Sequence, residues 1–95
     1  MNMISSSEAF SQFSTWKNSK RRLDVTVIVS GKTVDRLPNV RVYEVDESAS
    51  VVGLVGSTPH SFKDFDVVDS IFSSDSSRMI VMRKDSDWLV FEELA

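Results

Sequence analysis

The hydrophobic pattern of this chain changes its period at Leu23, and this change constrains the fold more than any other feature. Before it, Phe10, Phe13 and Trp16 recur every three residues, the spacing of one helix face. From Leu23 to Val29 apolar and polar residues largely alternate, which is the period of a half-buried strand. The sequence therefore predicts a mainly β chain with one N-terminal helix.

A capping signal predicts where this helix begins. Ser5 is followed three residues later by Glu8, the spacing of a capping box in which each side chain bonds the other residue's backbone amide. The basic cluster Lys20–Arg22 suits the negative end of the helix dipole. We expect the helix over residues 6–19. Its aromatic face should pack on the rest of the domain, because so short a helix is marginal in water.

Turn signals divide the remainder into short strands. Residues 30–32 (Ser-Gly-Lys) and 46–48 (Asp-Glu-Ser) predict turns. Pro38 lacks an amide donor and predicts a bulge or kink within the second strand. Gly53 predicts a bend or a close backbone approach in the third strand.

The last third of the chain is less regular. Residues 57–77 mix helical spacing with strand-forming residues and stay ambiguous, with a lean towards strand. Residues 78–83 and 88–93 are strand-like runs that alternate only weakly, as strands do when they face a core on one side and a partner on the other. A helix followed by five or more short strands predicts a small β-barrel, because closure removes sheet edges.

Charge and composition exclude several classes of protein. The chain has 95 residues, a net charge of −3 and no cysteine. This length indicates one domain, and the absence of cysteine excludes disulfides and zinc–cysteine sites. The net charge argues against nucleic-acid binding by bulk charge. However, residues 1–22 carry four basic residues against one acidic residue, whereas the body of the chain is acidic.

The sequence lacks the motifs of several functional classes. There is no nucleophile elbow, no phosphate-binding glycine loop and no paired His–carboxylate motif, so we expect a non-enzymatic protein without a metal or cofactor. No run is apolar and long enough for a membrane helix or an export signal. We therefore expect a cytoplasmic protein that does not bind membranes.

Two stretches resemble the signatures of the Sm-like family, which includes Sm and Lsm proteins and the bacterial RNA chaperone Hfq. In the region 23–56, Gly31 matches the hairpin glycine, and residues 45–52 match the hydrophobic–Asp turn and the strand after it. In the region 78–93, residues 79–91 match a strand, an Arg-Gly pair, a polar turn and a second strand.

The resemblance implies a fold for the whole chain. This fold is an N-terminal helix followed by a bent five-stranded Sm-like (SH3-like) barrel. It forms a single domain over residues 1–95, with residues 57–77 as a variable insertion. The resemblance further implies that subunits join into a closed ring through their edge strands, which would hide the edges of the last strands.

The resemblance also implies a site for single-stranded RNA at the pore of the ring. Ser48 stands where the family has a stacking residue, Ser50 where it has Asn, and Lys84 where it has Gly. Ser50 has a single hydroxyl and cannot make a two-point amide contact with a base. The residues expected to form the slot are Asp46, Ser48, Ser50, Arg83 and Lys84. Those expected to contact phosphates beside the pore are Lys17, Lys20, Arg21 and Arg22.

Two alternatives stay open. The incomplete slot favours a non-catalytic oligomeric assembly or protein-interaction module that has lost the RNA pocket. A lone SH3-like adaptor barrel is a third reading. Self-association is expected in the first two cases.

Overall fold

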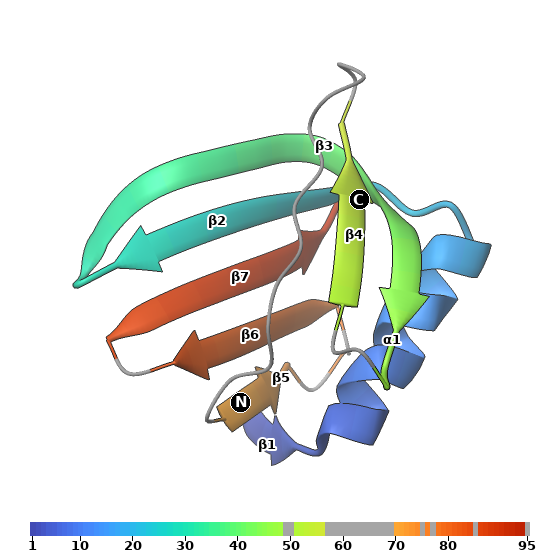
Figure 1. Cartoon of the computed structure of the whole chain (residues 1–95), viewed down its shortest axis with the longest axis horizontal. Coiled ribbons are helices and arrows are strands. Elements are labelled where there is room, and N and C mark those ends of the chain that lie inside the picture. The colour runs from blue at the N-terminus through green and yellow to red at the C-terminus, as the bar shows by residue number, and fades with distance from the viewer. Residues whose placement is uncertain (49–50, 57–69, 75, 77, 85, 95) are drawn as a thin grey trace.

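The computed structural model describes residues 1–48, 51–56, 70–74, 76, 78–84 and 86–94 (Figure 1). The helix is α1 (Ser6–Asn18), and it follows a short strand, β1 (Asn2–Ile4). The other strands are β2 (Leu23–Val29), β3 (Lys32–Asp46), β4 (Val51–Val55), β5 (Ser70–Ser73), β6 (Met79–Lys84) and β7 (Asp87–Glu93).

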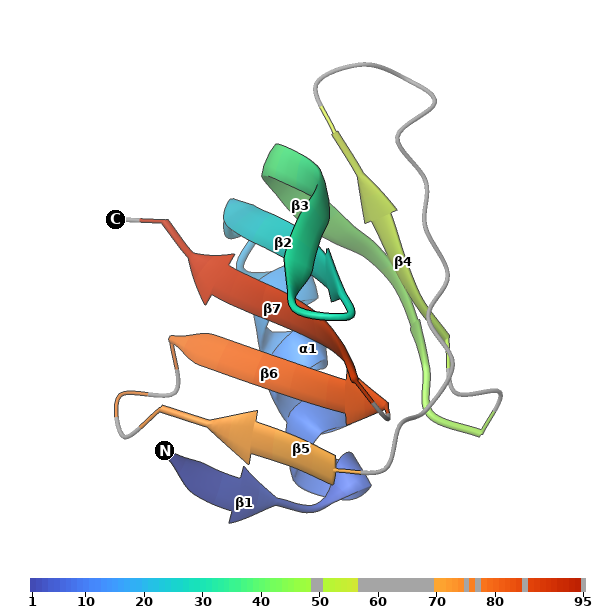
Figure 2. The same ribbon diagram turned by 90° about the vertical axis from the view of Figure 1, so that its left-hand side faces the viewer.

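These strands form one antiparallel sheet that curls into a half-barrel, with the order β1-β5-β6-β7-β2-β3-β4 (Figures 1 and 2). The mainly β fold with an N-terminal helix is confirmed. The count of five strands is wrong, because the described part of the chain forms seven. β1 and β5 are three and four residues long, too short to give a periodic signal, and they extend the sheet beyond β6.

Two bulges, near Pro38 and at Tyr43, separate the two halves of β3, which belong to different parts of the curled sheet, and a further register shift at Val34 lies near its start. Leu23 pairs with Val40 and Val25 with Leu37, which leaves one extra residue in the stretch that holds Pro38. The predicted bulge at Pro38 is thus confirmed. Asn39 has a φ of 55°, and its amide donates to Asp24 Oδ1 at 3.0 Å. This hydrogen bond satisfies an amide that the bulge removes from the ladder.

The second bulge lies opposite Gly53. Val42 pairs with Leu54 and Glu44 with Gly53, so that Tyr43 is the extra residue. Gly53, where the sequence predicts a bend or a close backbone approach, lies opposite this bulge, and the prediction for the glycine itself stays open. Because of the extra residue, two neighbouring side chains, Tyr43 and Glu44, are both exposed, and 59% of the surface of Tyr43 is accessible.

The core lies between α1 and the concave side of the sheet. The aromatic rings of the helix are all buried. The ring centre of Phe13 lies 5.0 Å from that of Phe91 of β7, in an edge-on arrangement. The helix begins as predicted, since the Ser5 hydroxyl accepts from the Glu8 amide at 3.1 Å and Glu8 Oε1 accepts from the Ser5 amide at 3.2 Å. Figure 2 shows the helix behind the sheet, where it covers the concave side.

Phe13 in the core and Phe72 on the other face of the sheet give a matched test of this packing. Phe13→Ala is expected to lower the free energy of unfolding by about 3–5 kcal/mol, because it leaves a cavity in a fully buried site. Phe72→Ala is expected to cost only about 1–2 kcal/mol, because that ring is partly exposed on the other face of the sheet. Urea denaturation followed by circular dichroism measures both. Equal losses would contradict the placement of the core.

Candidate functional site

The residues expected to form the RNA slot lie at two separate places in the fold. Asp46 ends β3, and its Oδ1 accepts from the Ser48 hydroxyl at 2.7 Å. Arg83 is near the end of β6, and its guanidinium carbon lies 5.5 Å from the centre of the Trp88 ring. Figure 1 draws the ends of β3 and β6 well apart. The structure thus brings Asp46 and Ser48 together and places Arg83 elsewhere on the same chain.

The side chains of two residues of the expected slot lie outside what the structure describes. Ser50 lies outside the described residues. Lys84 is the last residue of β6, and only its backbone is described. The role that the resemblance gives to these residues stays a prediction.

The four basic residues that follow the aromatic stripe separate in the structure. Arg21 Nε pairs with Glu93 Oε1 at 3.2 Å, at the end of β7. Arg22 donates to the carbonyl oxygen of Asn39 at 3.5 Å, beside the first bulge. Lys17 and Lys20 instead line a groove with residues of β3 and β4. The cluster is therefore not one patch, and only half of it faces an open site.

We call this site the cationic groove. It has a volume of about 210 Å³ and is lined by Lys17, Lys20, Arg41, Val42, Tyr43 and Val55. Arg41 and Val55 are direct cross-strand partners. None of the described residues that line the groove is acidic. The groove therefore combines three cations, an exposed aromatic ring and a small apolar floor.

The end of α1 places Lys20 in this groove. The Arg21 amide donates to the Trp16 carbonyl at 3.0 Å and the Lys20 amide to the Lys17 carbonyl at 3.2 Å, which is the hydrogen-bond pattern of a Schellman cap. In this motif the residue at Lys20 is left-handed, and its φ is 54°. Glycine is usually found there, so the lysine is held in a strained conformation.

Sequence reasoning singled out Lys17 and Lys20 but missed Arg41 and Tyr43. The sequence did hold a signal, the alternation of valine with other residues at positions 40–43. The structure buries Val40 and Val42, and the residues between and after them point outwards. What the sequence could not show is that the bulge at Tyr43 and the end of the helix meet at one place. That contact depends on how α1 lies across the sheet.

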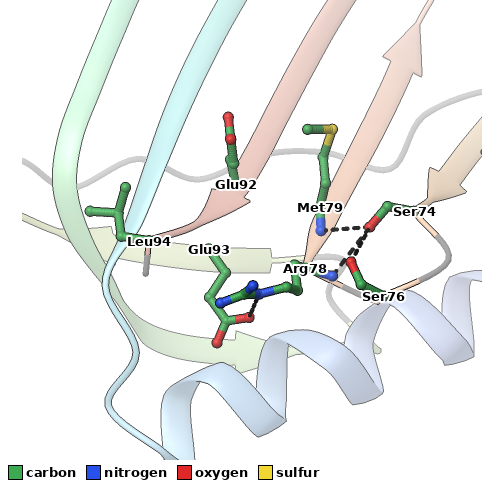
Figure 3. Close-up of a pocket in the computed structure, with 7 residues that line it drawn as sticks. All are labelled: Ser74, Ser76, Arg78, Met79, Glu92, Glu93 and Leu94. Carbon is green, nitrogen blue, oxygen red and sulfur yellow. Dashed lines mark hydrogen bonds and ion pairs between the residues drawn. The ribbon is translucent and has the colours of Figure 1, made fainter.

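A second open pocket lies at the start of β6 and the end of β7 (Figure 3). It has a volume of about 400 Å³ and is lined by Ser74, Ser76, Arg78, Met79, Glu92, Glu93 and Leu94. The Ser74 hydroxyl accepts from the amides of Arg78 and Met79, both at 3.2 Å, and Arg78 Nε pairs with Glu93 Oε2 at 3.5 Å. These contacts join strand ends and pair the charges of Arg78 and Glu93, so this pocket is the weaker candidate.

Other kinds of site are not found in the described residues. No group of three or more His, Asp or Glu residues there could hold a metal ion. Within the same ranges, no helix is long and apolar enough to span a membrane. Comparison of the chain with protein-family models, with curated proteins and with solved structures gives no significant match.

The strain at Lys20 gives a paired stability test. Lys20→Gly is expected to raise the free energy of unfolding by about 1 kcal/mol, because glycine adopts a positive φ without a steric penalty. Lys17→Gly is expected to lower it by about 0.5–1 kcal/mol, because that residue is inside the helix. Urea denaturation measures both, and each variant loses the same charge. A loss of stability in Lys20→Gly would contradict the strained cap.

Proposed function

We propose that this chain binds single-stranded RNA at the cationic groove. The observation that carries the proposal is the convergence of Lys17, Lys20 and Arg41 around the exposed ring of Tyr43. Lysine and arginine neutralise phosphates, and an aromatic ring stacks on a base, which is worth about 1–3 kcal/mol per base. A net charge of −3 does not oppose this, because the acidic residues lie outside the described lining of the groove.

The number of cations sets the expected salt dependence. For single strands, log K falls with log salt with a slope of about −0.7 per neutralised phosphate, so three contacts give a slope of about −2. Raising the salt concentration from 50 to 200 mM is then expected to weaken binding about 20-fold. A larger slope would require more contacts than the described groove provides.

The Sm-like ring is a separate prediction that RNA binding at the groove does not require, and the sheet order constrains how such a ring could close. β6 lies between β5 and β7, and β7 lies between β6 and β2, so both strands are already paired on both sides. The strands at the two ends of the described sheet are β1 and β4. A ring closed by edge pairing would therefore use β1 or β4, and Arg83 of one subunit would approach Asp46 only across an interface.

The second candidate function is an assembly module without RNA. It is favoured by β4, whose sequence Val-Val-Gly-Leu-Val has no charged residue, although edge strands usually carry charges that prevent pairing. The two candidates predict different results, since the assembly module does not respond to RNA.

Fluorescence anisotropy with labelled U-rich and A-rich oligonucleotides over a salt series tests the proposal. Arg41→Ala is expected to weaken binding severalfold at 50 mM salt and to reduce the slope by about 0.7. Tyr43→Ala is expected to weaken binding without changing the slope, because stacking releases no counterion. The matched control is Arg36→Ala, an exposed arginine of the same strand that does not line the groove, and it should leave affinity unchanged.

Three outcomes would contradict the proposed site. The first is the absence of binding at 50 mM salt, which would favour the assembly module. The second is an equal effect of Arg36→Ala and Arg41→Ala, which would indicate non-specific attraction. The third is a loss of binding in Arg83→Ala with no effect of Arg41→Ala, which would favour the slot expected from the Sm-like resemblance.

A further inference from the structure

The sheet has an outer face, the side turned away from α1, and the centre of this face is apolar. Register pairing places Met3, Phe72, Val81, Val90 and Thr26 in one row across β1, β5, β6, β7 and β2. Antiparallel sheets that face water on one side normally carry polar residues there. Here four of the five residues in the central row are large and apolar.

Burial separates this row from the core. Val81 is only 5% exposed and is not part of the core cluster under the helix. Met3, at the end of the row, is 70% exposed. In Figure 2 the outer face is turned towards the viewer, and no described element is drawn in front of β5 and β6. The described chain therefore leaves this apolar face uncovered.

The two sides of the central row carry opposite charges. On one side, Met79, Glu92 and Asp24 form a neighbouring row across β6, β7 and β2. Figure 3 shows Glu92 and Met79 on the opposite side of the sheet from Glu93, which points towards α1. On the other side, Arg83, Trp88 and Ile28 form a row in which the arginine lies over the tryptophan ring. The first row is acidic and the second is basic and aromatic.

We propose that the outer face binds a second copy of this chain and forms a symmetric dimer. A two-fold axis along the central row exchanges the two flanking rows, so Glu92 of each copy lies over the Arg83–Trp88 pair of the other. The apolar centre then packs on itself. An axis along the strands would instead lay the acidic row on the acidic row and the basic row on the basic row, so charge selects the first arrangement.

The size of the face predicts a weak dimer. Five strands spaced about 4.8 Å apart and about six residues long, at about 3.3 Å each, cover about 20 by 20 Å. This footprint of about 400 Å² per partner is about half of the roughly 800 Å² per partner that specific interfaces bury. We therefore expect a weak, transient dimer. No described residue that lines the cationic groove belongs to the three rows, so the dimer contacts do not use the groove residues.

Sedimentation equilibrium of the full chain over a wide concentration range tests the dimer. The expected mass rises from that of the 10.7 kDa chain to twice that mass. Val90→Lys is expected to keep the chain monomeric, because it places a charge at the centre of the face. Val34→Lys, a matched change at an exposed valine of β3 outside the described rows, should leave the association unchanged.

A charge exchange tests the arrangement. Arg83→Glu and Glu92→Arg are each expected to weaken association at least tenfold, and the double variant is expected to restore it to within about threefold of the original. Circular dichroism confirms that each variant folds. If Arg83→Glu fails to fold, Glu92→Arg and Val90→Lys still decide the question, because Glu92 is exposed and Val90 lies outside the core cluster.

Several results would overturn the dimer. They are a monomer at every concentration, an assembly that Val90→Lys does not change, an assembly larger than a dimer, and a folded double variant that stays dissociated. The dimer does not depend on RNA binding, since Arg41→Ala should affect only the latter. The two proposals can therefore fail separately.

Discussion

The burial of the aromatic face of α1 against the concave side of the sheet is the contact on which the rest of the structure depends. Phe13 contacts Phe91 of β7 and the other two rings of the helix. A helix of this length is marginal by itself, and a half-barrel has an open concave side, so each covers what the other exposes. Because the helix lies on one side only, the sheet is left with two different faces.

Both proposed surfaces follow from this asymmetry. The end of the helix meets the bent half of β3 and brings Lys20 beside Tyr43, at the price of a strained cap at Lys20. No helix of the described residues covers the opposite face of the sheet, where the apolar row lies and where we propose the second copy binds. The groove is formed by β3, β4 and the end of α1, and the outer-face rows lie on β1, β5, β6, β7 and β2, so RNA binding and self-association do not compete for the same residues.

The sequence predicts the local features well and the long-range ones poorly. The capping box at Ser5 and the bulge at Pro38 are found where predicted, because each depends on the chemistry of a few adjacent residues. β1 was missed, because three residues carry no period and its pairing with β5 connects distant parts of the chain. For the same reason Tyr43 was not recognised. Its role depends on a helix end about two dozen residues away.

The proposed site for the nucleic acid is the cationic groove and not the slot expected around Arg83. Titration of the isotope-labelled chain with a U-rich oligonucleotide, followed by the backbone amide signals in nuclear magnetic resonance spectra, distinguishes the two sites. Binding at the groove is expected to shift signals at the end of α1, at residues 41–43 and at Val55. Shifts centred on Asp46 and Arg83, or no shifts at low salt, would contradict it.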